Sequence, residues 1–239
     1  RRISPVGLIL FSLSLTYFAF DLLMSLDAHW YSTIFGVYYF SGAFMGALAF
    51  MILICIWVCS TGAVGRAINR EHFHDLGKLM FGMVVFWAYI AFSQYLLIWY
   101  ADLPEETVFF KYRTQHGWEY VSILLLLLHF IVPFILLLSQ DAKRNLNVLL
   151  GGAVLLLFAH LLDMYWLVMP NYAMALQPGM ALEEVARRPD ALAFHWLDFA
   201  SLLGVGGVYL AVVFYRMSQA SLVPVGDPRL QRSLRLQNA

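Results

Sequence analysis

The feature that most constrains this chain is a series of six long, continuous apolar runs. They cover roughly residues 5–26, 33–63, 79–101, 118–140, 146–169 and 193–216. A helix needs about 20 mainly apolar residues to cross a bilayer, whereas barrel strands are about ten residues long and alternate in polarity. Backbone polar groups in lipid must be bonded internally, so such runs predict helices. We expect an all-α, polytopic transmembrane bundle over residues 1–217 and a tail over 218–239.

The composition excludes a water-soluble fold and several kinds of redox site. Hydrophobic residues make up 62% and charged residues 13% of the chain, against about half and a quarter in soluble domains. The net charge is zero, so it indicates no nucleic-acid partner. The two cysteines, Cys55 and Cys59, form neither a haem-attachment motif nor an iron–sulfur ligand set and are interpreted as packing residues. We expect no covalently bound cofactor and no metal in this chain.

Lysine and arginine predict the orientation, because connections rich in them face the cytoplasm. One side of the predicted bundle carries Arg1, Arg2, Arg66, Arg70, Lys78, Lys143, Arg144, Arg216, Arg229, Arg232 and Arg235. The other side carries Lys111, Arg113, Arg187 and Arg188. Both chain ends are therefore predicted to be cytoplasmic. The outer connections, 102–117 and 170–192, are either a docking surface or plain solvated loops, and the tail is either flexible or partner-bound.

Seven ionisable residues lie within the apolar runs. Such residues cost from about 2.5 to over 10 kcal/mol inside a membrane, so they usually face a bundle interior and have a function. They are Asp21, Glu119, His129, His160, Asp163, His195 and Asp198. Counting along each predicted span places all seven in its outer half or near the midplane. We predict that they form an outward-facing proton half-channel.

Two histidine–aspartate pairs support this prediction. His160 and Asp163, like His195 and Asp198, are three residues apart and share a helix face. A carboxylate beside an imidazole can accept its N–H and fix its tautomer, which makes a proton relay that works near neutral pH. The alternative is that these groups only hydrogen-bond helices together. Asp21 and Glu119 belong to the path less securely, because either side chain can reach the interface.

The connection between the second and third runs offers a second kind of site. His72, His74 and Asp75 lie in the segment RAINREHFHDLGK, which covers residues 66–78. They could ligate a metal, although a solvated amphipathic connection is the commoner use of such a segment. Aromatic residues gather at the outer ends of the runs as an interfacial belt, and some of them could stack on a quinone ring.

Three segments suggest a family. FDLLMSLDAHWYSTIFGVYYFSGAF (residues 20–44), HFHDLGKLMFGMVVFWAYIAFSQYLLIWYADLPEET (72–107) and HLLDMYWLVMP (160–170) resemble the ActF membrane subunits of bacterial alternative complex III, which are NrfD-like and PsrC-like. The likeness runs through most of residues 4–216. It implies a bacterial inner-membrane subunit of a quinol:cytochrome c or quinol:acceptor oxidoreductase. Members have about ten spans, so we expect the whole protein to be longer than this chain.

The resemblance also implies cofactors and partners. Haem c and iron–sulfur clusters belong to outer partner subunits that pass electrons to cytochrome c or a terminal oxidase, and the quinol site is attributed to an ActC-like sister subunit. We therefore expect a proton path here and leave open whether this chain also holds a menaquinone or other quinone. Two other functions stay open. One is a b-type haem anchor using His129, His160 and His195, and the other is an ion-coupled secondary transporter.

Overall fold

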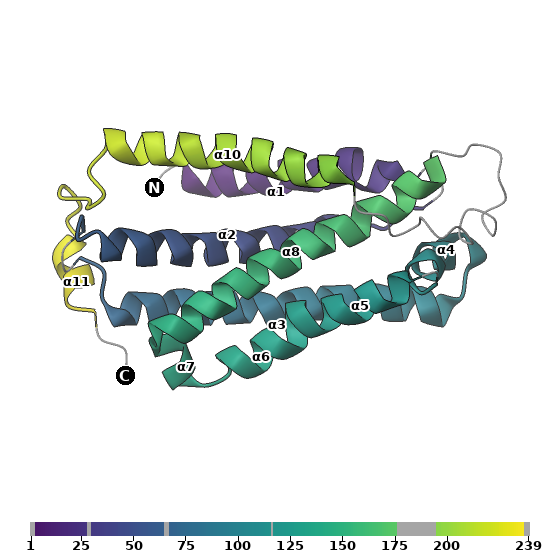
Figure 1. Cartoon of the computed structure of the whole chain (residues 1–239), viewed down its shortest axis with the longest axis horizontal. Helices are drawn as coiled ribbons and strands as arrows, with labels where there is room; N and C mark the ends of the chain where they lie inside the picture. The colour runs from purple at the N-terminus through teal and green to yellow at the C-terminus, as the bar shows by residue number, and fades with distance from the viewer. Residues whose placement is uncertain (1–2, 28–29, 65–66, 116, 176–194, 237–239) are drawn as a thin grey trace.

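The computed structural model describes residues 3–27, 30–64, 67–115, 117–175 and 195–236, without the side chains of 172–175 (Figure 1). Every regular element in these ranges is a helix, and six helical segments are long and apolar enough to cross a membrane. They are α1 (Ser4–Leu22) with η1 (Met24–Leu26), α2 (Phe35–Ser60), α3 (Arg70–Ala101), α5 (Trp118–Leu126) continued through η2 (Leu127–Ile131) into α6 (Val132–Leu137), α8 (Leu146–Ala175) and α10 (Trp196–Gln219). The predicted all-α transmembrane bundle is confirmed.

The third span begins earlier than predicted. Residues 70–78 were expected in a connection, but they form the first turns of α3. The cause is a capping box at Asn69, whose side-chain oxygen accepts hydrogen bonds from the backbone N–H groups of Glu71 and His72. Much of the predicted connection 170–192, with Arg187 and Arg188, lies outside the described residues, as do Arg1, Arg2 and Arg66.

Four of the spans form the centre of the molecule. Helix α2 packs against α3 and α8, and the α5–η2–α6 span contacts both α3 and α8. Helix α1 packs on α2, where Gly36 lets the backbone approach Thr16 closely. Helix α10 contacts α2 through the ring pairs Phe50–Tyr209 and Trp57–Phe214. The start of α1 and the short helix α11 (Leu230–Leu234) lie toward the same end of the bundle (Figure 1).

The core has two chemically different halves. Toward the end that carries α4 (Pro104–Arg113), it is an aromatic core of Trp30, Phe35, Tyr38, Trp87, Phe109, Trp118 and Trp166 with smaller apolar residues. Toward the end that carries α7 (Gln140–Arg144), it is an aliphatic core built mainly from Met45, Leu48, Ile52, Met80, Val84, Leu137, Leu149 and Leu156. The polar residues of the candidate site lie where the two halves meet.

Candidate functional site

A fully buried carboxylate lies among the central helices. The Asp163 side chain on α8 is 0% exposed. Its Oδ1 accepts a hydrogen bond from the Tyr38 hydroxyl of α2 at 2.5 Å, and its Oδ2 accepts one from the indole Nε1–H of Trp87 on α3 at 3.3 Å. Each oxygen is thus bonded to a different neighbouring helix. Because an unbonded carboxylate in an apolar interior is very costly, these two donors are what make the position tolerable.

His160 occupies a space that two glycines leave open. Its ring lies against the α2 backbone, where a Cβ added at Gly42 would come within 3.0 Å of its Nδ1 and one added at Gly46 within 3.1 Å of its Cδ2. The same added Cβ at Gly42 would lie 3.5 Å from Oδ2 of Asp163, so the two side chains are neighbours. The two side chains are not hydrogen-bonded to each other. Asp163 uses Tyr38 and Trp87 instead, and Nδ1 of His160 has no hydrogen-bond partner among the described residues.

His129 is buried in a distorted turn. It lies in the π-helical segment η2, and π-helical turns occur frequently at functional sites. Pro133 contributes to the distortion, because it has no N–H to donate to the carbonyl four residues earlier, which is that of His129 itself. The imidazole packs on Trp87 with ring centroids 3.8 Å apart. Neither of its ring nitrogens has a hydrogen-bond partner in the described part of the chain.

Together these residues form a compact set of groups that can exchange protons. The ring centroids of His129 and His160 are 6.3 Å apart, and Asp163 lies beside His160. Carboxylate and imidazole are the side chains that most often accept and release protons in catalysis and transport. Polar ring nitrogens buried without partners are unusual and call for an explanation. The arrangement can hold or relay a proton inside the bundle.

A cavity of about 530 Å³ opens beside this set, within the aromatic half. Its wall includes Tyr38 and Trp87, the two residues that bond Asp163, together with Arg113, Gln94 and Ser122. Most of the remaining lining is apolar or aromatic, with Phe35, Phe92, Tyr95, Phe109, Phe110, Phe130 and Trp166 as its rings. A volume of this size with few polar groups is typical of a small-molecule site.

Arg113 is a residue of this site that the sequence analysis placed in an outer loop as an ordinary charge. It ends α4 and its side chain is 1% exposed. Its Nε donates to the carbonyl of Trp166 at 3.1 Å, and its terminal nitrogens donate to the carbonyls of Phe109 at 2.8 Å and Leu167 at 2.9 Å. The guanidinium also stacks 3.5 Å from the centroid of the Phe109 ring.

The position of Arg113 follows from a proline inside α8. Pro170 has no N–H, so the carbonyl of Trp166, four residues earlier, loses its helical donor. Arg113 supplies the missing hydrogen bond. Burial lowers the pKa of Arg113 to about 9, although the negative charge of Asp27 acts in the opposite direction. Pro170, directly after the predicted run 146–169, was the one sequence signal that α8 would need a donor from elsewhere.

The second predicted pair, His195 and Asp198, has a local structural function. His195 is the N-cap of α10, and its Nδ1 accepts a hydrogen bond from the backbone N–H of Leu197 at 3.3 Å. Oδ2 of Asp198 in turn accepts a hydrogen bond from the backbone N–H of His195 at 2.9 Å. These two side chains are not hydrogen-bonded to each other either, because both bond backbone N–H groups at the start of the helix.

Asp21 and Glu119 are also separate from the buried set. Asp21 is exposed near the end of α1. Glu119 is half-buried, and its Oε2 accepts a hydrogen bond from the backbone N–H of Gly117 at 2.7 Å. The membership of these two residues and of the His195–Asp198 pair in a proton path stays a prediction, whereas His129, His160 and Asp163 lie together.

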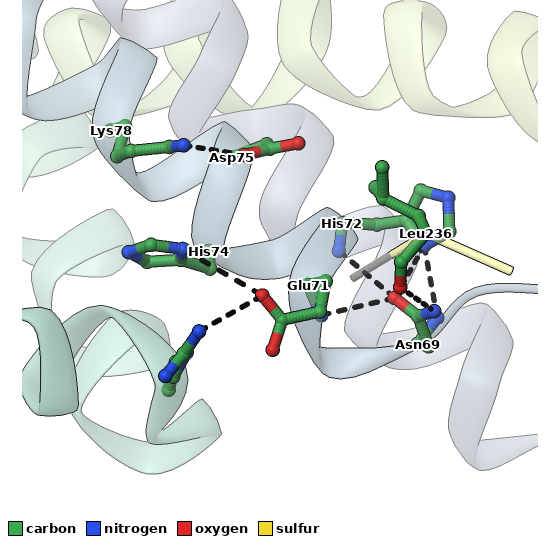
Figure 2. Close-up of polar contacts among 8 residues, drawn as sticks. Asn69, Glu71, His72, His74, Asp75, Lys78 and Leu236 are labelled. Carbon is green, nitrogen blue, oxygen red and sulfur yellow. Dashed lines mark hydrogen bonds and ion pairs between the residues drawn. The ribbon is translucent and has the colours of Figure 1, made fainter. Parts of the chain in front are cut away.

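The segment predicted as an alternative metal site is held by hydrogen bonds and ion pairs (Figure 2). His72 contacts Asn69, while Nδ1 of His74 lies 4.0 Å from a carboxylate oxygen of Glu71, and Asp75 pairs with Lys78 at 2.7 Å. Within the described ranges, no group of three or more His, Cys, Asp or Glu side chains is arranged to hold a metal ion. The tail folds back onto this segment, since Ser233 bonds His72 at 2.9 Å and the carbonyl of Leu236 accepts from Asn69 at 3.2 Å.

Comparison with known proteins adds no assignment. No protein-family model and no curated protein matches this chain.

Proposed function

We propose that this chain is an integral membrane subunit of a quinol-oxidising electron-transport complex of the alternative complex III type, in the bacterial cytoplasmic membrane. The observation that carries the proposal is the buried Asp163, whose two oxygens are bonded to two residues of the cavity wall. Oxidation of a quinol releases protons as well as electrons, so a quinol site needs a proton acceptor next to it. Tyr38, Trp87, His160 and Asp163 all lie within the three segments that resemble the ActF subunits.

The cavity suits a quinol headgroup. A quinol is a flat ring with two hydroxyls and an apolar tail, and the cavity combines aromatic walls with the hydroxyl of Tyr38 and the amide of Gln94. Its volume of about 530 Å³ falls within the usual range of roughly 300–1,000 Å³ for small-molecule sites. In this proposal the chain binds the quinol, or shares its binding with an ActC-like sister subunit, and takes up its protons. Haem c and iron–sulfur groups of outer partner subunits take the electrons and deliver them to cytochrome c or a terminal oxidase.

The direction of proton release follows from the charge distribution. The end of the bundle that carries α7 and α11 holds most of the lysines and arginines, and by the positive-inside rule this end is cytoplasmic. The cavity then opens toward the outer half, and protons from Asp163, His160 and His129 would leave outward. The aliphatic core on the other side separates them from the cytoplasm.

The test is the substitution Asp163→Asn in the purified complex, with quinol oxidation and proton release measured together. Asn keeps the size of the side chain and can still bond Tyr38, but it cannot take up a proton. We expect the rate of quinol oxidation to fall by roughly 10²-fold or more, as is usual when a general base is removed. Asp102→Asn, at the exposed end of α3 and outside the predicted path, is the matched control and should leave the rate within twofold. Unchanged oxidation and proton release in Asp163→Asn would overturn the proposal.

An absorbance spectrum of the same preparations separates this function from that of a b-type haem anchor. If His129 and His160 carry protons, the purified chain alone should have no Soret band, while the assembled complex shows the haem c bands of its partners. A Soret band that stays with the isolated chain and disappears in His129→Ala would assign the histidines to haem instead.

A further inference from the structure

In the described part of the chain, two side chains of the cavity wall hydrogen-bond Asp163, and they differ in what they can do with a proton. Trp87 presents an indole N–H, which donates a hydrogen bond but has no lone pair with which to accept one. Tyr38 presents a phenolic hydroxyl, which can donate one hydrogen bond while accepting another. A proton can therefore pass through Tyr38 but not through Trp87.

We propose that Tyr38 transfers protons from the hydroxyl of a ligand in the cavity to Asp163. This inference rests on the proposed function, because it takes that ligand to be a quinol. In the step, the quinol O–H proton moves to Oη of Tyr38 while the Tyr38 O–H proton moves to Oδ1 of Asp163. One O–H bond breaks and one forms at Tyr38, so the tyrosine is unchanged and Asp163 gains one proton. The quinol's electrons leave to the haem c and iron–sulfur groups of the partner subunits and do not pass through Tyr38.

The Tyr38 hydroxyl is held in the required position. The Tyr38 ring is 4% exposed, stacks on Phe35 with centroids 6.3 Å apart and lies 5.8 Å from the Trp87 ring. One turn further along α2, Gly42 lies against the side chains of both His160 and Asp163. This close approach fixes the distance between α2 and α8. The hydroxyl is therefore held against the carboxylate by a residue that also lines the cavity.

Beyond Asp163 the proton has neighbours that can accept it. His160 lies beside Asp163, and both side chains lie against Gly42. The next imidazole is that of His129, whose ring centroid is 6.3 Å from the ring centroid of His160. Trp87 contacts both ends of this set, since it donates to Asp163 and its ring packs at a tilt against that of His129. In the proposed order Tyr38 acts first and Asp163 second, the histidines exchange the proton with Asp163, and Trp87 is a positioning residue.

The chain offers a matched pair of variants to test this order. Tyr38→Phe removes the hydroxyl but keeps the ring. Tyr39→Phe removes a hydroxyl from the next position of α2, whose ring packs on Phe18 and is not part of the cavity wall. In the purified complex, with menadiol as the quinol and cytochrome c as the electron acceptor, we expect Tyr38→Phe to lower kcat by roughly 10²-fold with little change in KM. The solvent isotope effect, which is the ratio of kcat in H₂O to kcat in D₂O, should also differ between Tyr38→Phe and the wild type. Tyr39→Phe should match the wild type in both measurements.

Asp163→Asn, measured in parallel, separates failure of this inference from failure of the proposed function. If Asp163→Asn is slow while Tyr38→Phe turns over like the wild type, protons reach Asp163 by another way and the role of Tyr38 is overturned alone. If both variants turn over like the wild type, the inference and the proposed function both fall.

A measurement on the wild type keeps the proposal testable if Tyr38→Phe does not assemble. Binding of menadione should shift a carboxyl band in the infrared difference spectrum, and that band should be absent in Asp163→Asn. Binding of menadione without such a shift would overturn the proposed contact through Tyr38.

Discussion

Arg113 donates its Nε–H to the carbonyl of Trp166, which Pro170 leaves without a helical partner. A residue from a short helix outside the spans thus completes the hydrogen bonding of a transmembrane helix. The same arginine packs its guanidinium on the ring of Phe109. It therefore joins α4 to α8 at the wall of the cavity, and its contribution to stability can be separated from that of the proline.

Arg113→Met should destabilise the protein, because it leaves the carbonyl of Trp166 buried without a donor, whereas the carbonyl of Leu167 still accepts from the side-chain amide of Asn171. Each buried group left unpaired costs roughly 1–3 kcal/mol. Pro170→Ala restores the backbone N–H, so the double variant should lose less stability than the sum of the two single losses. Thermal unfolding of the four proteins in one detergent gives this comparison. Strictly additive losses would show that Arg113 does not compensate for Pro170.

Gly42→Ala should displace His160, since the added Cβ would lie 3.0 Å from its ring. The contacting atoms belong to a ring held within the bundle, so the helices must separate or the imidazole must turn away. We expect lower thermal stability and slower quinol oxidation in the assembled complex. Gly82→Ala on α3 is the control, because a Cβ there meets nothing within 4 Å. It should be neutral or stabilising by up to about 1 kcal/mol. Equal behaviour of the two variants would refute this role for Gly42.

Ser233→Ala should loosen the tail from the bundle. The variant loses the hydrogen bond to His72, and tail residues that pack near this contact include Leu222, Pro224 and Leu230. A hydrogen bond of this kind contributes roughly 0.5–1.5 kcal/mol. Amide hydrogen exchange over residues 220–236 should then become about two- to tenfold faster. Arg232→Ala, at an exposed position of the same short helix, should leave exchange unchanged. Exchange in Ser233→Ala as slow as in the wild type would show that the contact does not hold the tail.

Stability at alkaline pH should depend on Tyr112, which lies in α4 outside the spans. Burial, and secondarily the negative charge of Asp27, raise the pKa of Tyr112 to about 12 from its ordinary value of 10.0. Between these two values the folded protein holds more protons than the unfolded chain, so the free energy of unfolding falls as the pH rises. The stabilisation is complete below pH 10 and is lost between about pH 10 and 12. Melting temperatures of Tyr112→Phe should therefore fall less steeply over this range than those of the wild type. If the melting temperatures of the two proteins fall equally steeply with pH, Tyr112 does not cause this loss of stability.

The spans were predictable because the hydrocarbon core demands long apolar helices whatever their partners. Six such helices occur among the described residues, with most ends near the predicted ones. The start of α3 differed because a local capping box at Asn69 decides where a helix begins, and the average polarity of the segment does not reveal it. His195 and Asp198 likewise act as local caps, which the average polarity of their segment does not reveal. Their spacing at the start of an apolar run is also the pattern of a capping box.

The site was predictable only in part. The full burial of His129 and Asp163 and the partial burial of His160 follow from their positions in apolar runs, and the structure brings these three together. Their partners were not predictable, since Tyr38 and Trp87 come from other helices and look like ordinary aromatic residues in the sequence. Contacts between spans depend on the rotation and separation of helices, which spacing along one helix does not specify.

The division of the core into two halves has an electrical consequence. The aliphatic core consists of apolar side chains, whereas the aromatic half holds the cavity and the buried polar groups beside it. Across an energised membrane, most of the voltage falls over the layer that is least polarisable, which here is the aliphatic layer. A charge that crosses the full potential gains or loses about 2.3 kcal/mol per 100 mV. Protons moving between Asp163 and the α4 end would cross little of that voltage, so their release would cost almost the same in energised and de-energised membranes.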